Sequence, residues 1–224
     1  MTLYGRGLRT FCLLLRKKLN AMLTYWLLFF TPALVALVSG PLMRVRADGT
    51  RSMRIDDTWM LIIVTLTVVI GFRYEVGGDW ANYFRYLFGA ESLNFSALVG
   101  LDDPGYWALN ILSAKLGLGM TGVNTFGAFF FSIGLVMFCR SLPRPWLALA
   151  CAMPYLVTVV AMGYTRQSIA LGLVMIGFVV LGRQRFVFFA LWVLAGALFH
   201  KSAVLLVPIA ALVMSKNRLL SLSL

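Results

Sequence analysis

Residues 73–86 read RYEVGGDWANYFRY and directly follow a predominantly apolar run, residues 60–72. No other stretch of the chain is as polar and as aromatic at once. A Gly-Gly pair followed by Asp is typical of a tight turn, where the backbone can approach a ligand closely. The alternative is an interfacial loop whose aromatic side chains lie at headgroup depth. In both cases the stretch marks the point where a membrane helix ends and a polar segment begins.

The composition around this stretch is that of a membrane protein. Hydrophobic residues make up 61% of the 224 positions, charged residues make up 12%, and the mean hydropathy is +0.87. Several apolar runs are long enough to cross a hydrocarbon core of about 30 Å. We therefore predict an all-α, polytopic membrane helical bundle that forms a single transmembrane domain over residues 1–224.

The formal net charge of +12 does not indicate a nucleic-acid partner. Basic residues between membrane spans normally set the topology and meet anionic lipid headgroups. We expect membrane lipid, and no nucleic acid, among the partners.

The hydrophobic runs predict about six transmembrane helices. We expect them at residues 19–42, 58–72, 122–139, 146–163, 167–181 and 186–214, after a basic N-terminal tail at residues 1–18. His200, Lys201 and Ser202 interrupt the last run. That run is either one strongly tilted helix or two half-helices around a re-entrant break.

The longest connection, residues 73–120, is expected to be a periplasmic loop. Within it, residues 105–119 have the amphipathic pattern of an interfacial helix. Three basic turns, residues 140–145, 183–185 and 216–218, are predicted to be cytoplasmic, which places Arg166 and His200 on the outer side. The basic N-terminal tail argues for the opposite orientation, so charge alone does not decide the topology.

The acidic residues are confined to one part of the chain. All 8 fall between residues 48 and 103, yet Arg166, His200 and Lys201 lie beyond that segment, next to apolar runs. An ionisable group at membrane depth is usually paired or lines a wet cavity. The partners of these cations are acids folded over them, backbone carbonyls or an anionic ligand, and arginine suits phosphate or carboxylate. The structural alternatives are snorkelling for Arg166 and hydrogen-bonded packing for His200.

Metal and nucleotide cofactors are not expected. One histidine, with no acid after Asp103, cannot supply the ligand set of a metal site, and there is no glycine-rich phosphate loop. The 3 cysteines stand singly in apolar surroundings and are interpreted as packing residues.

Four short segments, in order, resemble a known family. The pattern Arg-x-x-Val-Gly-Gly-Asp-x-x-x-Tyr at residues 73–83 resembles the hallmark segment of the EpsG family, with Gly78 in place of the usual Thr. The later segments are DPGY at residues 103–106, YTRQSIA at residues 164–170 and FHKSA at residues 199–203. The likeness covers roughly residues 58–210.

The resemblance implies a Wzy-type polymerase of the bacterial inner (cytoplasmic) membrane, acting at its periplasmic face. Such enzymes join lipid-linked repeat units of exopolysaccharide, capsule or O-antigen. The donor glycan is carried on undecaprenyl pyrophosphate and the acceptor is a sugar hydroxyl of another lipid-linked unit. A chain-length regulator or a flippase is a possible partner. Such polymerases commonly continue through several more spans, so the expectation includes a truncated copy, a short member, or half of a site completed by another chain.

The resemblance also suggests roles for particular residues. Expected catalytic residues are His200, Asp79 and Arg166, with His200 or Asp79 as the base and Arg166 as a fixed cation. Expected substrate-binding residues are Arg73, Gly77, Gly78, Tyr83, Asp103, Tyr106, Gln167 and Lys201. The alternative is a non-catalytic transporter or flippase, or a remnant that binds an anionic lipid-linked glycan. That alternative uses the same cations but needs no base.

Overall fold

The computed structural model describes residues 22–39, 56–98 and 100–208, and within these ranges all regular structure is helical. The elements are a helix at Met22–Val38, α2 (Asp57–Gly71), α3 (Trp80–Glu91), the 3-10 turn η1 (Phe95–Leu98), α4 (Pro104–Lys115), α5 (Gly119–Ser141), α6 (Pro145–Ala152), the π-helix η2 (Met153–Ala161), α7 (Thr165–Leu181), α8 (Phe186–Ala197) and the 3-10 helix η3 (Lys201–Leu206). The all-α class is confirmed. The predicted N-terminal tail and the residues after 208 lie outside the described ranges.

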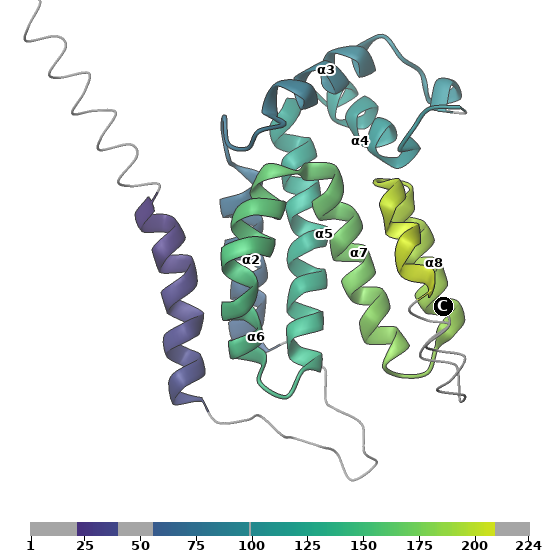
Figure 1. Ribbon diagram of the computed structural model, residues 1–224. Coiled ribbons are helices and arrows are strands. Elements are labelled where there is room, and N and C mark those ends of the chain that lie inside the picture. The colour runs from purple at the N-terminus through teal and green to yellow at the C-terminus, as the bar shows by residue number, and fades with distance from the viewer. Residues whose placement is uncertain (1–21, 40–55, 99, 209–224) are drawn as a thin grey trace, which may run out of the picture.

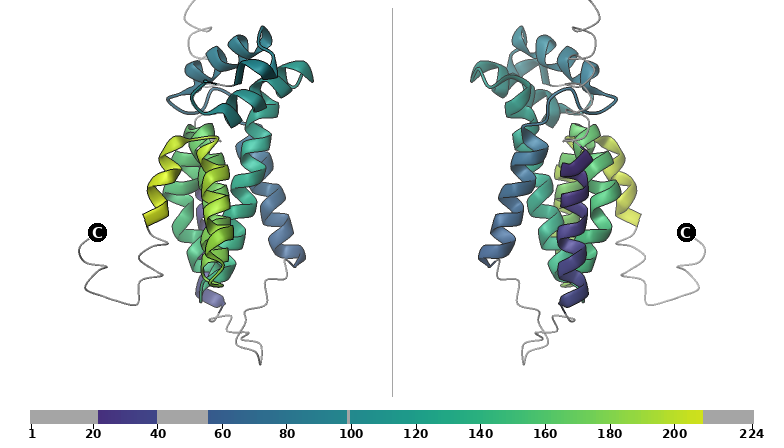
Figure 2. Two further views of the ribbon diagram at one scale, coloured as in Figure 1. Left: turned by 90° about the vertical axis from the view of Figure 1, so that its right-hand side faces the viewer. Right: turned by 90° about the vertical axis from the view of Figure 1, so that its left-hand side faces the viewer.

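The helices form a bundle with a cap across one end (Figure 1). The helices α2, α5, α6 with η2, α7 and α8 run side by side, while α3 and α4 lie across the end where α2 finishes and α7 begins. Figure 2 shows the cap over the same end of the bundle from two further sides, with Met22–Val38 along the outside. Polar segments far apart in the sequence therefore meet beneath the cap.

The predicted spans can be compared with the helices by length and composition. One helix of the described residues, α5 with 23 residues, is long and apolar enough to cross a membrane. Apolar helices of 10–17 residues stand at the other predicted positions: Met22–Val38, Asp57–Gly71, Pro145–Ala161, Thr165–Leu181 and Phe186–Ala197. The number of six spans and the periplasmic side of the loop remain predictions.

Two glycines allow α5 and α7 to pack closely against each other. A Cβ atom built on Gly172 would lie 2.6 Å from the Phe130 carbonyl oxygen and 2.7 Å from the Phe131 Cα atom. A Cβ atom on Gly134 would meet the Gly172 backbone in the same way. Small residues allow two helix backbones to approach closely, which is how apolar helices pack where lipid offers no hydrophobic driving force.

The last apolar run is broken, which decides between its two interpretations. After α8, His200 has an extended backbone (φ −156°, ψ 110°) and η3 begins at Lys201. Ala203 of η3 packs into one buried cluster with Phe189 and Val193 of α8. The yellow segment in Figure 1 accordingly turns back beside α8. The described part of this run therefore consists of two helical pieces around a break.

The segment between α2 and α5 contains a helix that was not predicted. The expected helix at residues 105–119 is found as α4, but α3 forms from the opening stretch itself. Tyr83, Leu87 and Ala90 of α3 are buried at helical spacing, while the opposite face is exposed. This amphipathic face packs on α4 and makes the cap a pair of helices.

Candidate functional site

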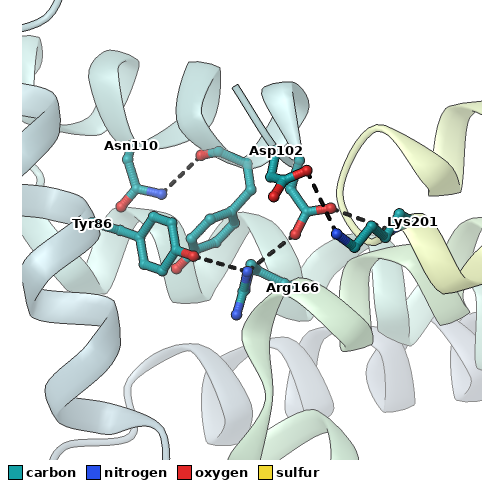
Figure 3. A network of polar contacts seen from close by, with 7 residues as sticks. Tyr86, Asp102, Asn110, Arg166 and Lys201 are labelled. Atoms are coloured by element: carbon teal, nitrogen blue, oxygen red, sulfur yellow. Dashed lines mark hydrogen bonds and ion pairs between the residues drawn. The ribbon is translucent and has the colours of Figure 1, made fainter. Parts of the chain in front are cut away.

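The site lies where the cap meets the bundle, and its centre is Arg166 in the first turn of α7. The Arg166 Nη1 atom donates to Asp103 Oδ2 at 3.0 Å and to the Tyr86 hydroxyl at 3.0 Å (Figure 3). The guanidinium carbon also lies 4.9 Å from the centroid of the Tyr86 ring. Charge pairing and the face of an aromatic ring both stabilise the cation. The side chain is 24% exposed, so part of it still faces the exterior.

Asp103 joins Arg166 to the break between α8 and η3. While Oδ2 accepts from Arg166, Oδ1 accepts from the Lys201 backbone N–H at 3.2 Å. Asp103 precedes α4 with a left-handed backbone (φ 54°, ψ 57°), a conformation that aspartate tolerates better than most residues. The next turn is held as well, because the Gly105 N–H donates to the Leu198 carbonyl at 2.8 Å. One carboxylate therefore fixes α4, α7 and η3 relative to each other.

The partner of Arg166 answers a question that the sequence left open. The sequence allowed three kinds of partner: acids folded over the cations, backbone carbonyls or an anionic ligand. In the structure the partner is an acid from residues 48–103, namely Asp103. Lys201 pairs in the same way, with its Nζ atom 3.5 Å from Asp102 Oδ1. Both side chains of that second pair are exposed, so water and salt weaken it.

These two ion pairs differ in burial, which leads to a testable difference in stability. We expect Asp103→Asn to lower the free energy of unfolding by about 2 kcal/mol, because a buried, charge-assisted hydrogen bond to Arg166 is lost. Asp102→Asn is the matched control and should cost less than about 0.5 kcal/mol, as exposed pairs do. Thermal unfolding of the detergent-solubilised protein measures both. Equal costs would contradict a structural role for the Asp103 pair.

His200 immediately precedes Lys201, whose backbone N–H donates to Asp103. Its side chain is half-buried, and its Nδ1 atom is buried with no hydrogen-bond partner among the described residues. Buried polar atoms are normally satisfied, so the unpartnered Nδ1 atom of His200 needs an explanation. A neutral imidazole with an unoccupied nitrogen can accept a proton.

Tyr83 and Tyr106 lie beneath the site rather than on its surface. They are 2% and 0% exposed, and their rings meet edge to face at 5.8 Å. Burial raises the pKa of both phenols, so both stay neutral at physiological pH. They support the cap from within, and neither presents a face to a bound sugar in this structure.

Arg73 is also buried and does not share partners with Arg166. It is 7% exposed and donates to the carbonyls of Ile70 and Ala161, both at 3.0 Å. It also donates to Asn124 Oδ1 at 3.1 Å and to Thr165 Oγ1 at 2.6 Å. Burial lowers the pKa of Arg73 to about 10, which leaves the side chain charged at neutral pH.

The remaining predicted residues are placed less centrally. Asp79 accepts from Asn82 Nδ2 at 3.1 Å, and no hydrogen bond or ion pair in the described ranges joins it to Arg166 or His200. Gln167 is exposed.

The two predicted glycines differ in what they require. Gly77 has a positive φ of 102°, and a Cβ there would lie 2.7 Å from the Gly163 Cα atom, so this position requires glycine. A Cβ on Gly78 would meet nothing within 4 Å. The turn therefore depends on one member of the Gly-Gly pair, and the second could carry a side chain.

Sequence reasoning missed Tyr86, Asp102 and the Arg73 partners Asn124 and Thr165. Tyr86 ends the opening stretch and Asp102 precedes Asp103, so their positions were available signals. Nothing in the local pattern marked Asn124, which lies 51 residues from Arg73.

The apolar helices of the bundle, with a polar and charged cluster at one end, are those of a membrane protein. A family model described as the EpsG family matches residues 58–224, and the chain belongs to that family. This confirms the resemblance and extends it beyond residue 210. A search of curated proteins and a search of solved structures each found no match. Membership indicates a polymerase of polysaccharide biosynthesis in general terms, with a lipid-linked saccharide as substrate.

Proposed function

We propose that this protein is a polysaccharide polymerase that transfers a glycan from a lipid pyrophosphate to a sugar hydroxyl of another lipid-linked repeat unit. The products would be exopolysaccharide, capsule or O-antigen, and the carrier would be undecaprenyl pyrophosphate. The observation that carries this proposal is the meeting of Arg166, Asp103 and the His200–Lys201 segment at one end of an apolar bundle. Family membership supports the general class of reaction.

The reaction needs a charge-stabilising group and a proton acceptor. The acceptor hydroxyl oxygen forms a bond to the anomeric carbon of the donor while the bond from that carbon to the pyrophosphate oxygen breaks. The lipid pyrophosphate leaves with the electron pair, and the hydroxyl proton passes to a base. Arg166 and Lys201 are the cations that would stabilise the leaving group, since fixed donors aimed at developing charge contribute strongly to catalysis.

His200 is the better placed of the two proposed bases. Its Nδ1 atom has no partner in the described structure, and the adjacent Lys201 N–H is bonded to the carboxylate that holds Arg166. Asp79 has a partner in Asn82 and no bonded link to that cluster. We therefore assign the base to His200, with Asp79 as the alternative.

The predicted orientation of two basic turns supports a periplasmic site in the inner membrane. Arg166 and His200 lie at the cap end, while the basic turns 140–145 and 183–185 lie at the opposite end (Figure 1). Arg140 in that end pairs with Asp56 at 3.0 Å. With these turns on the cytoplasmic side, as predicted from the sequence, the cap would face the periplasm.

The substitution His200→Gln distinguishes the two proposed functions, an enzyme and a transporter. It keeps a polar side chain of similar size but removes the proton acceptor, and we expect polymer growth to fall about 100-fold, as for other losses of general base catalysis. The measurement is the length ladder of lipid-linked glycan in cells that carry only this copy of the gene. An immunoblot of the membrane fraction controls for the amount of protein.

Ser202→Ala is the matched control for His200→Gln, because Ser202 is exposed and lies in the same turn. It should leave the ladder unchanged. If His200→Gln left the ladder unchanged while Arg166→Ala abolished it, a non-catalytic transporter or flippase for an anionic lipid-linked glycan would explain the site instead.

A further inference from the structure

Arg73 is a buried cation whose partners are all neutral. Its hydrogen bonds go to two carbonyls, one amide oxygen and one hydroxyl. A buried charge without a carboxylate is costly unless other groups compensate it. The compensation has a source in the fold: Ile70 lies in the last turn of α2, and Ala161 is the last residue of η2. Helix C-termini carry partial negative charge and carbonyls without intrahelical partners, and arginine can cap them.

The other two partners lead directly to the functional site. Thr165 Oγ1 accepts from Arg73 and donates to Asn124 Oδ1 at 3.0 Å. Thr165 is 0% exposed and is the residue immediately before Arg166. The first turn of α7 is therefore held by a triangle of hydrogen bonds to Arg73 and to α5. That turn sets the direction in which the Arg166 side chain projects from α7.

This geometry conflicts with direct contact between Arg73 and substrate. The side chain is enclosed by the ends of α2, η2 and α7, and four of its hydrogen bonds are made within the protein. Arg166 keeps an exposed part and is bonded to the cap instead. One arginine is thus built into the scaffold, while the other remains available to a ligand.

We propose that Arg73 is a positioning residue, which acts through Thr165 to orient Arg166 and does not itself touch the substrate. The proposal rests on the proposed function only for the identity of the ligand, a pyrophosphate. It assigns to Arg73 a role different from the substrate-binding role that the family resemblance suggested.

The test uses the full chain in detergent and the substitution Thr165→Val. Valine keeps the shape of the buried side chain and removes the hydroxyl that bonds Arg73. The first readout is the rate at which phenylglyoxal modifies Arg166, followed by peptide mass spectrometry. The second is the affinity for inorganic pyrophosphate. We expect faster modification of Arg166, because its helix turn loosens, and about tenfold weaker pyrophosphate binding, as for the loss of a hydrogen bond to a charged group.

Two further variants make the test specific. Thr158→Val is the matched control, because the Thr158 hydroxyl is part-buried and donates to the Met153 carbonyl away from Arg73. It should change neither readout. Arg73→Lys keeps the charge but cannot reach all the partners of a guanidinium, so it should resemble Thr165→Val. The double variant should be no worse than the more affected single one, since both remove the same link.

The outcomes separate this proposal from the proposed function. An unchanged Arg166 modification rate in Thr165→Val, with pyrophosphate binding lost only when Arg73 is replaced, would show that Arg73 contacts the anion and overturn the inference. If Arg166→Ala bound pyrophosphate normally, the anion site of the proposed function would fail. The modification rate of Arg166 in Thr165→Val would still decide the positioning role, because it requires no ligand.

Discussion

Replacing Arg166 with alanine should lower the rate of polymer growth by about 1000-fold, with the protein still present in the membrane. Arg166 is the cation that the cap and the bundle together hold at the site, through Asp103 and Tyr86. Removing one preorganised donor from a developing negative charge costs about 100- to 1000-fold in other enzymes. The upper end is expected because Arg166 is the only part-buried cation of this cluster, Lys201 being exposed at 76%.

The length ladder of lipid-linked glycan measures this effect, with the membrane-bound amount of protein as its reference. Arg166→Lys should recover only part of the activity, since lysine keeps the charge but loses the planar fork that suits a pyrophosphate. Arg85→Ala is the matched control: Arg85 is an exposed arginine on the same cap. A ladder of normal length in the Arg166→Ala strain would remove Arg166 from the catalytic machinery.

The second large effect is expected from Gly172→Ala, although Gly172 is a packing position and not a residue of the site. The added methyl group would lie 2.6 Å from the Phe130 carbonyl oxygen and 2.7 Å from the Phe131 Cα atom. Both atoms belong to the backbone of α5, so no side chain can move aside. The two helices must separate, and overpacking of this kind costs about 3 kcal/mol. The free energy of unfolding should fall by that amount.

The same substitution should also reduce activity, because α7 carries Thr165 and Arg166 at its first turn. Gly182→Ala is the matched control at the other end of α7, where the nearest atom to a new Cβ lies at an ordinary 3.6 Å. Unfolding in denaturant, followed by circular dichroism, compares the two variants. Equal stability would mean that α5 and α7 are not packed backbone to backbone.

The sequence by itself determined the features that depend on local composition. Apolar runs predicted the helices, and the polar stretch at residues 73–86 predicted where α2 ends and the cap begins. The order of short motifs identified the family, which the match over residues 58–224 confirmed. The confinement of all 8 acids to residues 48–103 also limited the possible partners of Arg166. Each of these signals can be read without knowing which segments touch.

Only the tertiary structure decided which residues form the site and which support it. Arg73 and Arg166 are both arginines beside apolar helices, and no local pattern separates them. The fold buries Arg73 between helix ends and leaves Arg166 part-exposed beside Asp103, which is 63 residues away. The break after α8 was decided in the same way, because packing of Ala203 against α8 folds the chain back. The physical reason is that hydropathy and periodicity act over one or two turns, whereas burial and charge pairing depend on contacts between distant segments.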